Sequence, residues 1–253
     1  MRSIISAVIL FLIPVAAFGQ TTPSTVVAHQ SNLWLQGFST IRFDKHWSVP
    51  LEAQVRRAHT GLTWQILLLR ATLMRDINEH VAVGGGYGHQ ATHPAGPFAQ
   101  PATFGEHRTF EQLVLKNNWG AKHVEQRLRL EQRWIQRVDA VNRVALDEYF
   151  FQNRIRYRAG MTIPLPFEEK LKPARGEAET FLFLNDEVAF NFGRNVRQNT
   201  FDQNRLAAGI GQKLGKTILQ GGYLHQYVRR AGGYRIESNH VITLSVTYNI
   251  SLR

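Results

Sequence analysis

The sequence has no cysteine among its 253 residues. This absence excludes disulfide bonds, thiolate-bound zinc or iron–sulfur sites, and a cysteine nucleophile. Long apolar runs are also absent after the first twenty residues. Because a membrane-spanning helix needs about 20 consecutive apolar residues, a helical membrane protein is excluded. Acidic residues are few: 19 Asp and Glu stand against 30 Lys and Arg, which gives a formal net charge of +11.

The remaining composition is that of a folded protein. Hydrophobic residues make up 43% of the chain and aromatic residues 11%, whereas charged residues make up 19%. Disordered chains have the opposite balance, because they cannot bury enough apolar surface to fold. The length suits one large all-β domain, or one to two ordinary domains.

Residues 1–19 have the three parts of a secretory signal peptide. Arg2 supplies a positive charge, residues 4–13 are apolar, and Ala17 and Gly19 are the small residues that a signal peptidase recognises. We expect cleavage before Gln20, which leaves one domain over residues 20–253. An N-terminal membrane anchor is the alternative, but the apolar run is short and has no stop-transfer flank. Because such a chain leaves the cytoplasm, we expect no nucleic-acid partner despite the basic charge.

The clearest pattern in the rest of the chain is an alternation over residues 153–163, where one face is apolar and the other carries arginines. A period of two residues is typical of a β-strand. Residues 124–134 alternate in the same way, which favours a hairpin joined by the loop 138–147. We expect the apolar side chains of this hairpin to point outward, namely Leu128, Leu130, Trp134, Ile155, Tyr157 and Met161.

Nine further segments alternate less regularly, over residues 33–43, 47–57, 62–74, 80–90, 108–117, 180–191, 201–214, 217–229 and 239–252. Short polar turns and longer loops follow the segments in alternation. The turns are expected at 44–45, 75–79, 117–121 and 215–216, and the loops at 91–105, 138–147, 192–200 and 230–238. Residues 164–179 are the exception to this alternation.

Strands of about ten residues with one polar and one apolar face, joined in this manner, are typical of a transmembrane β-barrel. A soluble sandwich would have shorter strands. Aromatic residues near the strand ends fit a girdle at the two membrane interfaces: Trp34, Trp47, Trp64, Trp119, Trp134, Tyr149, Tyr223 and Tyr248. Bacterial barrels have an even number of antiparallel strands and short periplasmic turns. We therefore expect a twelfth strand within residues 25–30 and an antiparallel barrel of about 12 strands, with 10 as the next alternative.

Several segments together resemble one known family. They are 33–35 (LWL), 106–108 (EHR), 127–133 (RLRLEQR), 153–158 (NRIRYR), 186–188 (DEV), 191–193 (NFG), 201–205 (FDQNR) and 222–224 (GYL). In this order they resemble the family catalogued as domain of unknown function 2490, predicted outer-membrane barrels common in Bacteroidetes. The resemblance implies a location in the cell outer membrane, with outer-membrane lipid and the barrel assembly machinery as partners. It supplies no catalytic residues.

The candidate site is the arginine-rich face of the two clearest strands. Arginine side chains suit anion binding, because a guanidinium group donates two parallel hydrogen bonds to a phosphate or a carboxylate. If the face lines the lumen, we expect a narrow, porin-like pore that prefers anions, or a binder of a small anionic ligand. The alternative is that carboxylates of other strands pair with the arginines and plug a structural or adhesion barrel that acts through its external loops. The residues are Arg127, Arg129, Arg133, Arg154, Arg156 and Arg158.

A second prediction concerns an ion pair in the lumen. A hairpin of residues 185–191 and 201–205, symmetric about Val196, places Glu187 opposite Arg205 and Asn191 opposite Phe201. Directly opposed side chains are close enough for a charge-assisted contact. We expect Glu187→Gln or Arg205→Met alone to lower the unfolding temperature, and the exchange Glu187→Arg with Arg205→Glu to restore part of it.

Enzyme and metal sites find little support. A lipid hydrolase of the outer membrane is the less favoured alternative, because His225 and Ser245 lie in no known nucleophile motif. Residues 84–86 are three glycines without the helix start or lysine of a phosphate loop, so close packing is the expected role. Three histidines flank one loop at irregular spacing: His89, His93 and His107. We expect no enzyme activity, no cofactor and no metal.

Overall fold

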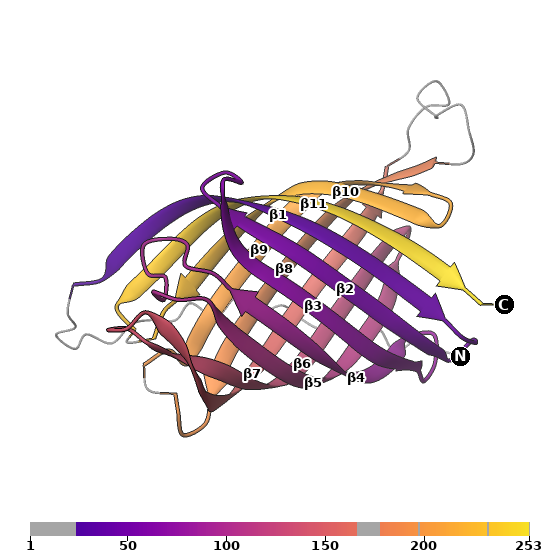
Figure 1. The fold of residues 1–253 in the computed structure, drawn as a ribbon. Coiled ribbons are helices and arrows are strands. Elements are labelled where there is room, and N and C mark those ends of the chain that lie inside the picture. The colour runs from indigo at the N-terminus through magenta and orange to yellow at the C-terminus, as the bar shows by residue number, and fades with distance from the viewer. Residues whose placement is uncertain (1–23, 166–177, 197, 232, 253) are drawn as a thin grey trace.

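The computed structural model describes residues 24–165, 178–196, 198–231 and 233–252, and within them the chain is all-β. Eleven strands of this described part close into one barrel (Figure 1). They are β1 (Val26–Arg42), β2 (Trp47–Ala58), β3 (Thr63–Asp76), β4 (Val81–Thr92), β5 (Phe104–Trp119), β6 (Lys122–Asp139), β7 (Val144–Pro164), β8 (Ala178–Phe192), β9 (Phe201–Leu214), β10 (Thr217–Arg229) and β11 (Arg235–Ser251). In the described residues, no helix is long and apolar enough to cross a membrane. The predicted signal peptide, residues 1–19, lies outside the described residues.

The barrel closes through a parallel pair. Each described strand is antiparallel to its neighbours in the chain, but β1 and β11 run in the same direction, from Val26 opposite Arg235 to Arg42 opposite Ser251. The predictions of 12 or 10 strands and of a fully antiparallel barrel are therefore wrong. Residues 25–30 form no separate strand, because they continue without a turn into β1. A parallel closing pair also removes the reason to expect an even number of strands.

The two ends of the barrel differ in their connections. One end, which we call the turn end, carries the connections 43–46, 77–80, 120–121 and 215–216. The other, which we call the loop end, carries 59–62, 93–103, 140–143, 193–200 and 230–234. Two predicted tight turns contain glycines with positive φ, Gly120 at 60° and Gly215 at 58°, as two-residue hairpin turns require. The predicted loop 138–147 is shorter than expected, because β6 extends to Asp139 and β7 already begins at Val144.

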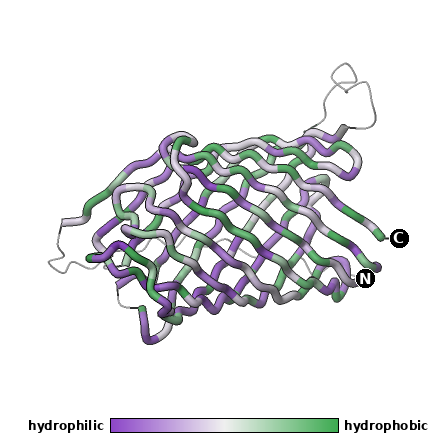
Figure 2. Tube along the Cα trace, in the orientation of Figure 1, coloured by the Kyte–Doolittle hydropathy of each residue, from purple (hydrophilic) through white to green (hydrophobic). Residues whose placement is uncertain are grey.

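The polarity of the fold is inverted relative to an ordinary globular protein. Among the described residues, 23 buried side chains are polar or charged and 13 are apolar. In β6, Arg129 is 3% exposed, whereas its neighbours Leu128 and Leu130 are 44% and 38% exposed. Figure 2 shows the resulting alternation of hydrophilic and hydrophobic positions along the strands. Polar side chains therefore fill the lumen, and leucines, isoleucines and valines cover the outer surface.

The aromatic residues predicted for the interfaces lie on this outer surface with one exception. Seven of the eight are exposed, at Trp47, Trp64, Trp119, Trp134, Tyr149, Tyr223 and Tyr248. The prediction that Trp34 belongs to the interfacial girdle is wrong, because its side chain is 2% exposed and lies in the lumen. Its neighbours of the same parity, Gln30, Asn32 and Gln36, give the physical reason, because they are polar and face inward with it.

Candidate ligand-binding site in the lumen

The β6–β7 hairpin supplies the arginine-rich wall of the lumen. Antiparallel pairing places Arg127 opposite Arg158 and Arg129 opposite Arg156. Like charges at directly opposed positions destabilise a sheet. The wall therefore requires carboxylates from other positions to offset the repulsion between the arginines.

Two buried carboxylates supply most of this compensation. Glu131, which is 0% exposed, accepts hydrogen bonds from Arg154 at 2.5 Å and from Arg156 at 2.7 Å. Glu187 of β8 accepts from Arg156 at 2.5 Å and from Arg127 at 2.8 Å. Arg156 thus bridges two carboxylates, one on each neighbouring strand.

The same network reaches β9. Arg154 donates to Asp202 at 2.8 Å, and Arg205 donates to Glu187 at 3.4 Å. A buried charge left without a partner is costly, so these contacts stabilise one another. We call this set the lumen network: Arg127, Glu131, Arg154, Arg156, Glu187, Asp202 and Arg205.

A second ion cluster lies nearer the loop end. Glu106 of β5 is 2% exposed and accepts two hydrogen bonds from Arg133, at 2.5 and 3.0 Å. Arg108 donates to the same carboxylate at 2.5 Å, and Arg133 also donates to Gln152 at 3.0 Å. All three nitrogen atoms of the Arg133 guanidinium group therefore donate hydrogen bonds within the protein.

The other two arginines of the predicted set lie in different surroundings. Arg129 donates twice to the Gln112 side-chain oxygen, at 3.0 and 2.6 Å, and stacks over the Phe110 ring at 4.3 Å. Arg158 lies 3.9 Å from Glu125, and its side chain is 35% exposed. The hairpin thus brings the six predicted arginines to one face, and Arg127 and Arg158 border open space.

The predicted β8–β9 register holds near Glu187 and changes beyond it. Glu187 lies opposite Arg205, and Ala189 lies opposite Gln203. A bulge between Ala189 and Phe190 then brings Phe190 opposite Phe201, so the predicted pairing of Asn191 with Phe201 is wrong. The extra residue lets the two Phe rings pack edge to face, with their centroids 5.8 Å apart.

Several lumen residues were not predicted from the sequence. Arg56 of β2 lies over the Trp34 ring at 3.9 Å and donates to the Gln54 side-chain oxygen at 3.0 and 2.7 Å. Arg70 of β3 donates to Glu52 at 2.7 Å. The shared parity of the polar residues 52, 54 and 56 was the available signal, although Pro50 lies on the same face.

Two cavities lie in the lumen, on either side of a shared group of side chains. The larger, which we call the turn-side cavity, has a volume of about 540 Å³ and extends to Lys116, His123 and Ser245. The smaller measures about 130 Å³ and extends toward Arg230 and Glu237 at the loop end. Both are lined by the same five residues, Trp34, Arg56, Arg70, Arg156 and Arg205. Met161, predicted to point outward, also borders the turn-side cavity.

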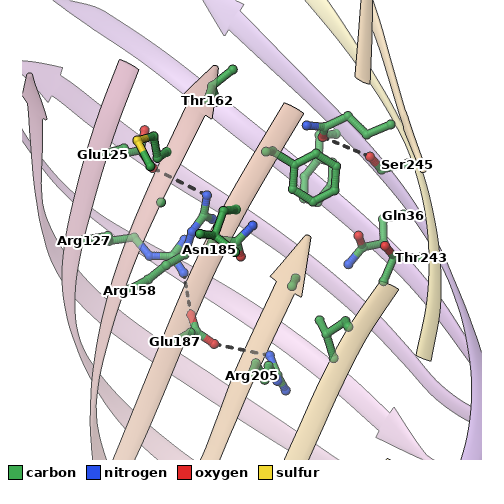
Figure 3. Close-up of a pocket in the computed structure, with 18 of the residues that line it drawn as sticks. Gln36, Glu125, Arg127, Arg158, Thr162, Asn185, Glu187, Arg205, Thr243 and Ser245 are labelled. Atoms are coloured by element: carbon green, nitrogen blue, oxygen red, sulfur yellow. Dashed lines mark hydrogen bonds and ion pairs between the residues drawn. The ribbon is translucent and has the colours of Figure 1, made fainter. Parts of the chain in front are cut away.

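The turn-side cavity carries an excess of positive charge. Its described lining holds seven cationic side chains and three carboxylates, an excess of four positive charges. Figure 3 shows Arg127 and Arg158 on one side of it and Glu187 between Arg127 and Arg205 at its base. The cations are Arg56, Arg70, Lys116, Arg127, Arg156, Arg158 and Arg205, and the carboxylates are Glu52, Glu125 and Glu187.

Three buried donors at this cavity have no hydrogen-bond partner among the described residues. They are the Nε1 atom of Trp34 and the Nε atoms of Arg156 and Arg205. Buried polar groups in folded proteins are nearly always paired with protein, water or ligand. Donors without acceptors beside an excess of cations give the site the chemistry of an anion receptor.

Comparison with protein families matches residues 31–239 to the family described as protein of unknown function (DUF2490). The chain belongs to this family. Comparisons with curated proteins and with solved structures gave no match. The resemblance predicted from the sequence is thereby confirmed, and the family description assigns no chemistry to the lumen.

In this member of the family, a loop covers part of the loop end. The connection 93–103 buries Ala95 to 8% exposure and brings the Phe98 ring to 5.7 Å from the Arg235 guanidinium. Gly96 of the same loop lies directly against the Gln30 side-chain amide of β1. The loop thus packs against both strands of the parallel pair at this end.

The histidines of the predicted loop do not converge. His89 lies opposite His107, with ring centroids 4.9 Å apart, whereas His93 contacts Thr103 at 3.1 Å. In the described part of the chain, no group of three or more histidine, aspartate or glutamate side chains could hold a metal ion.

The residues weighed for a hydrolase lie on different faces of the wall. Ser245 borders the lumen and donates to the Gln220 side-chain oxygen at 3.2 Å. His225 faces outward and contacts Ser238 at 2.9 Å, with the His240 ring beside it at 5.5 Å. His225 and Ser245 therefore lie on opposite faces of the barrel wall, where their side chains cannot contact each other.

Proposed function

We propose that this chain is an integral barrel of a bacterial outer membrane whose lumen is closed to free diffusion and whose turn-side cavity binds an anionic ligand. The apolar outer surface and charged interior support the membrane location, because lipid solvates leucine and not arginine. The strands have 12 to 21 residues, enough to cross a hydrocarbon layer that needs about 9–11. Outer-membrane lipid and the barrel assembly machinery are the partners that this location implies.

The buried ion network supports a closed lumen. Three of its members are at most 5% exposed: Glu131, Arg154 and Arg156. They lie on the adjacent strands β6 and β7, and β7 also pairs with β8. The side chains that line both cavities separate the large one from the small one. A binding barrel thus fits better than a porin-like pore.

The observation that carries the ligand proposal is the excess of cations with unpaired donors around the turn-side cavity. If carboxylates paired with every arginine, the charged side chains would only fill the lumen and would bind no ligand. Here Arg127 and Arg158 retain exposure toward the cavity, 16% and 35% of their side-chain surface. Because short turns face the periplasm in bacterial barrels, the cavity would receive its ligand from the periplasmic side.

Two measurements test this function. Calorimetric titration of the protein in lipid nanodiscs with inorganic phosphate is expected to show saturable binding, which Arg158→Met weakens. Arg137→Met is the matched control, since Arg137 lies near the loop-end terminus of β6, 3.8 Å from Glu148 and 56% exposed, and lines neither lumen cavity. In a planar bilayer we expect no steady conductance. A stable anion-selective current would instead support the pore, and recovery of the chain in the soluble fraction after carbonate washing would end the membrane proposal.

The second candidate is a structural or adhesion barrel. It is favoured by contacts that hold the connections of the loop end against the wall, such as Asn195 of the 193–200 loop donating to the Phe151 carbonyl of β7 at 2.6 Å. A chain with no measurable anion affinity and no conductance would support this candidate.

A further inference from the structure

The turn-side cavity has two chemically different walls. Lys116, Arg127 and Arg158 stand on β5, β6 and β7. Phe38 of β1 and Leu224 of β10 line the cavity from the other side of the strand order. In Figure 3, Arg127 and Arg158 lie on one side of the cavity and the uncharged polar residues Gln36 and Thr243 lie on the other.

The apolar wall is built around Phe183. Its ring lies over two glycines, so that a Cβ added to Gly209 or Gly222 would come within 2.6 or 2.8 Å of the ring. Glycine inside a strand weakens it and marks a close approach. Because these glycines have no side chain, the end of the Phe183 ring lies close to the barrel wall, and the aromatic side chain lines the cavity.

The cationic wall contains one pair that is poorly compensated. Arg127 and Arg158 oppose each other directly. Arg127 shares Glu187 with Arg156 and Arg205. Arg158 lies 3.9 Å from Glu125, and both side chains are more than a third exposed, at 35% and 45%. An anion between the two guanidinium groups would offset their repulsion.

The size of the cavity excludes an inorganic ion as a well-fitting ligand. Pockets of about 300–1,000 Å³ typically bury an organic molecule of drug size, with apolar contacts over most of its surface and a few placed polar groups. The volume of about 540 Å³ lies in this range. A phosphate ion alone would leave Phe38, Phe183 and Leu224 in contact with water.

We propose that the ligand is an organic anion with one carboxylate or phosphate head at Arg127 and Arg158 and a ring-sized apolar body against Phe38, Phe183 and Leu224. This inference rests on the anion-binding function proposed above and names the class of its ligand. Trp34 and Arg205, each with an unpaired buried donor, line the same cavity.

The test compares phenyl phosphate, inorganic phosphate and benzyl alcohol by calorimetry on the full barrel in lipid nanodiscs, at equal ionic strength. The probes are soluble in water, and empty nanodiscs give the non-saturating heat of any partition of benzyl alcohol into lipid, which is subtracted. Phenyl phosphate is expected to bind about tenfold or more tightly than inorganic phosphate, a ratio that corresponds to ~1.4 kcal/mol. Benzyl alcohol is expected to show no saturable binding.

Two variants separate the walls. Phe183→Ser is expected to bring the affinity for phenyl phosphate down to that for phosphate, and Arg158→Met to weaken both. Phe192→Ser, at an outward position of β8 that is 43% exposed, is the control for Phe183→Ser. Leu224→Ala is a second variant of the apolar wall should Phe183→Ser fail to refold by circular dichroism.

The outcomes distinguish the two proposals. Equal affinity for the two phosphates overturns the organic-anion inference and leaves the anion-binding function intact. Absence of binding for both phosphates overturns the anion-binding function itself. Saturable binding of benzyl alcohol as tight as that of phenyl phosphate overturns the role assigned to the arginines.

Discussion

At the scale of single residues, Glu187 forms ion pairs with three arginines of the lumen network. Its carboxylate contacts Arg156 at 2.5 Å, Arg127 at 2.8 Å and Arg205 at 3.4 Å, and its side chain is 7% exposed. Removing one member of a buried ionic network leaves its partners uncompensated, which costs about 3–5 kcal/mol. The charge of this one residue therefore links β8 to three other strands, β6, β7 and β9.

We predict that Glu187→Gln lowers the free energy of unfolding by about 3–5 kcal/mol, measured by urea titration of the refolded barrel. Glu179→Gln on the same strand is the matched control, because its contact with Lys213 at 3.1 Å is well exposed, at 66% and 48%. Exposed pairs contribute about 0–1 kcal/mol. Equal effects of the two substitutions would contradict the role of the network.

The exchange Glu187→Arg with Arg205→Glu is not expected to restore stability. The new arginine would lie beside Arg127 and Arg156, whose contacts with Glu187 are shorter than that of Arg205. The sequence prediction of a rescue assumed an isolated pair. A network of three arginines around one carboxylate changes that expectation.

At the scale of strands, the glycines of β10 show how one face of a strand is constrained. A Cβ on Gly222 would lie 2.6 Å from the Ala208 carbonyl oxygen and 2.8 Å from the Phe183 ring. A Cβ on the adjacent Gly221 would meet the Leu244 side chain at 3.6 Å, an ordinary contact. The two glycines differ only in the face that they present.

We predict that Gly222→Ala lowers the unfolding free energy by about 1–3 kcal/mol, since the backbone on one side of the contact cannot move aside. Gly221→Ala should change it by no more than about 0.5 kcal/mol. Heat-induced unfolding of both variants, followed by gel mobility, is the measurement. A stable Gly222→Ala would show that the wall relaxes there.

A further prediction concerns the outer face of β6. Leu130→Arg places a charge midway along the strand and, in a membrane, should cost about 2–4 kcal/mol. Leu62→Arg, in the 59–62 connection at 81% exposure, should cost about 0–1 kcal/mol because it lies near the interface. Urea titration in lipid vesicles measures both. Equal tolerance would argue against a membrane around β6.

The strands were predictable from sequence to the extent that alternation is a local property. Each of the eleven segments expected from the pattern overlaps one strand of the described barrel. The strand number was not predictable in the same way, because closure depends on which strand meets β1. The candidate site divides similarly: the parity of Arg129 and Arg156 is local, whereas the partners Glu106, Glu187 and Asp202 come from strands distant in sequence.

At the scale of the whole molecule, the parallel pair places the start of β1 and the end of β11 at opposite ends of the barrel, the indigo and yellow ends of the ribbon in Figure 1. In a membrane the two positions lie on opposite sides. We predict that an epitope inserted between Thr60 and Gly61 is labelled by antibody on intact cells. An epitope appended to the C-terminus should be labelled only after the outer membrane is permeabilised. Labelling of both on intact cells would contradict this orientation.

The parallel seam also limits how such a barrel can change in evolution. Meander barrels gain or lose strands as hairpins, two at a time, because a single added strand would reverse the direction of everything that follows it. A hairpin duplication leaves the directions of the first and last strands unchanged, so the seam stays parallel and the strand number stays odd. Relatives with longer or shorter chains are therefore expected to inherit an odd number of strands, and a relative with an even number would need a closing pair of the other kind.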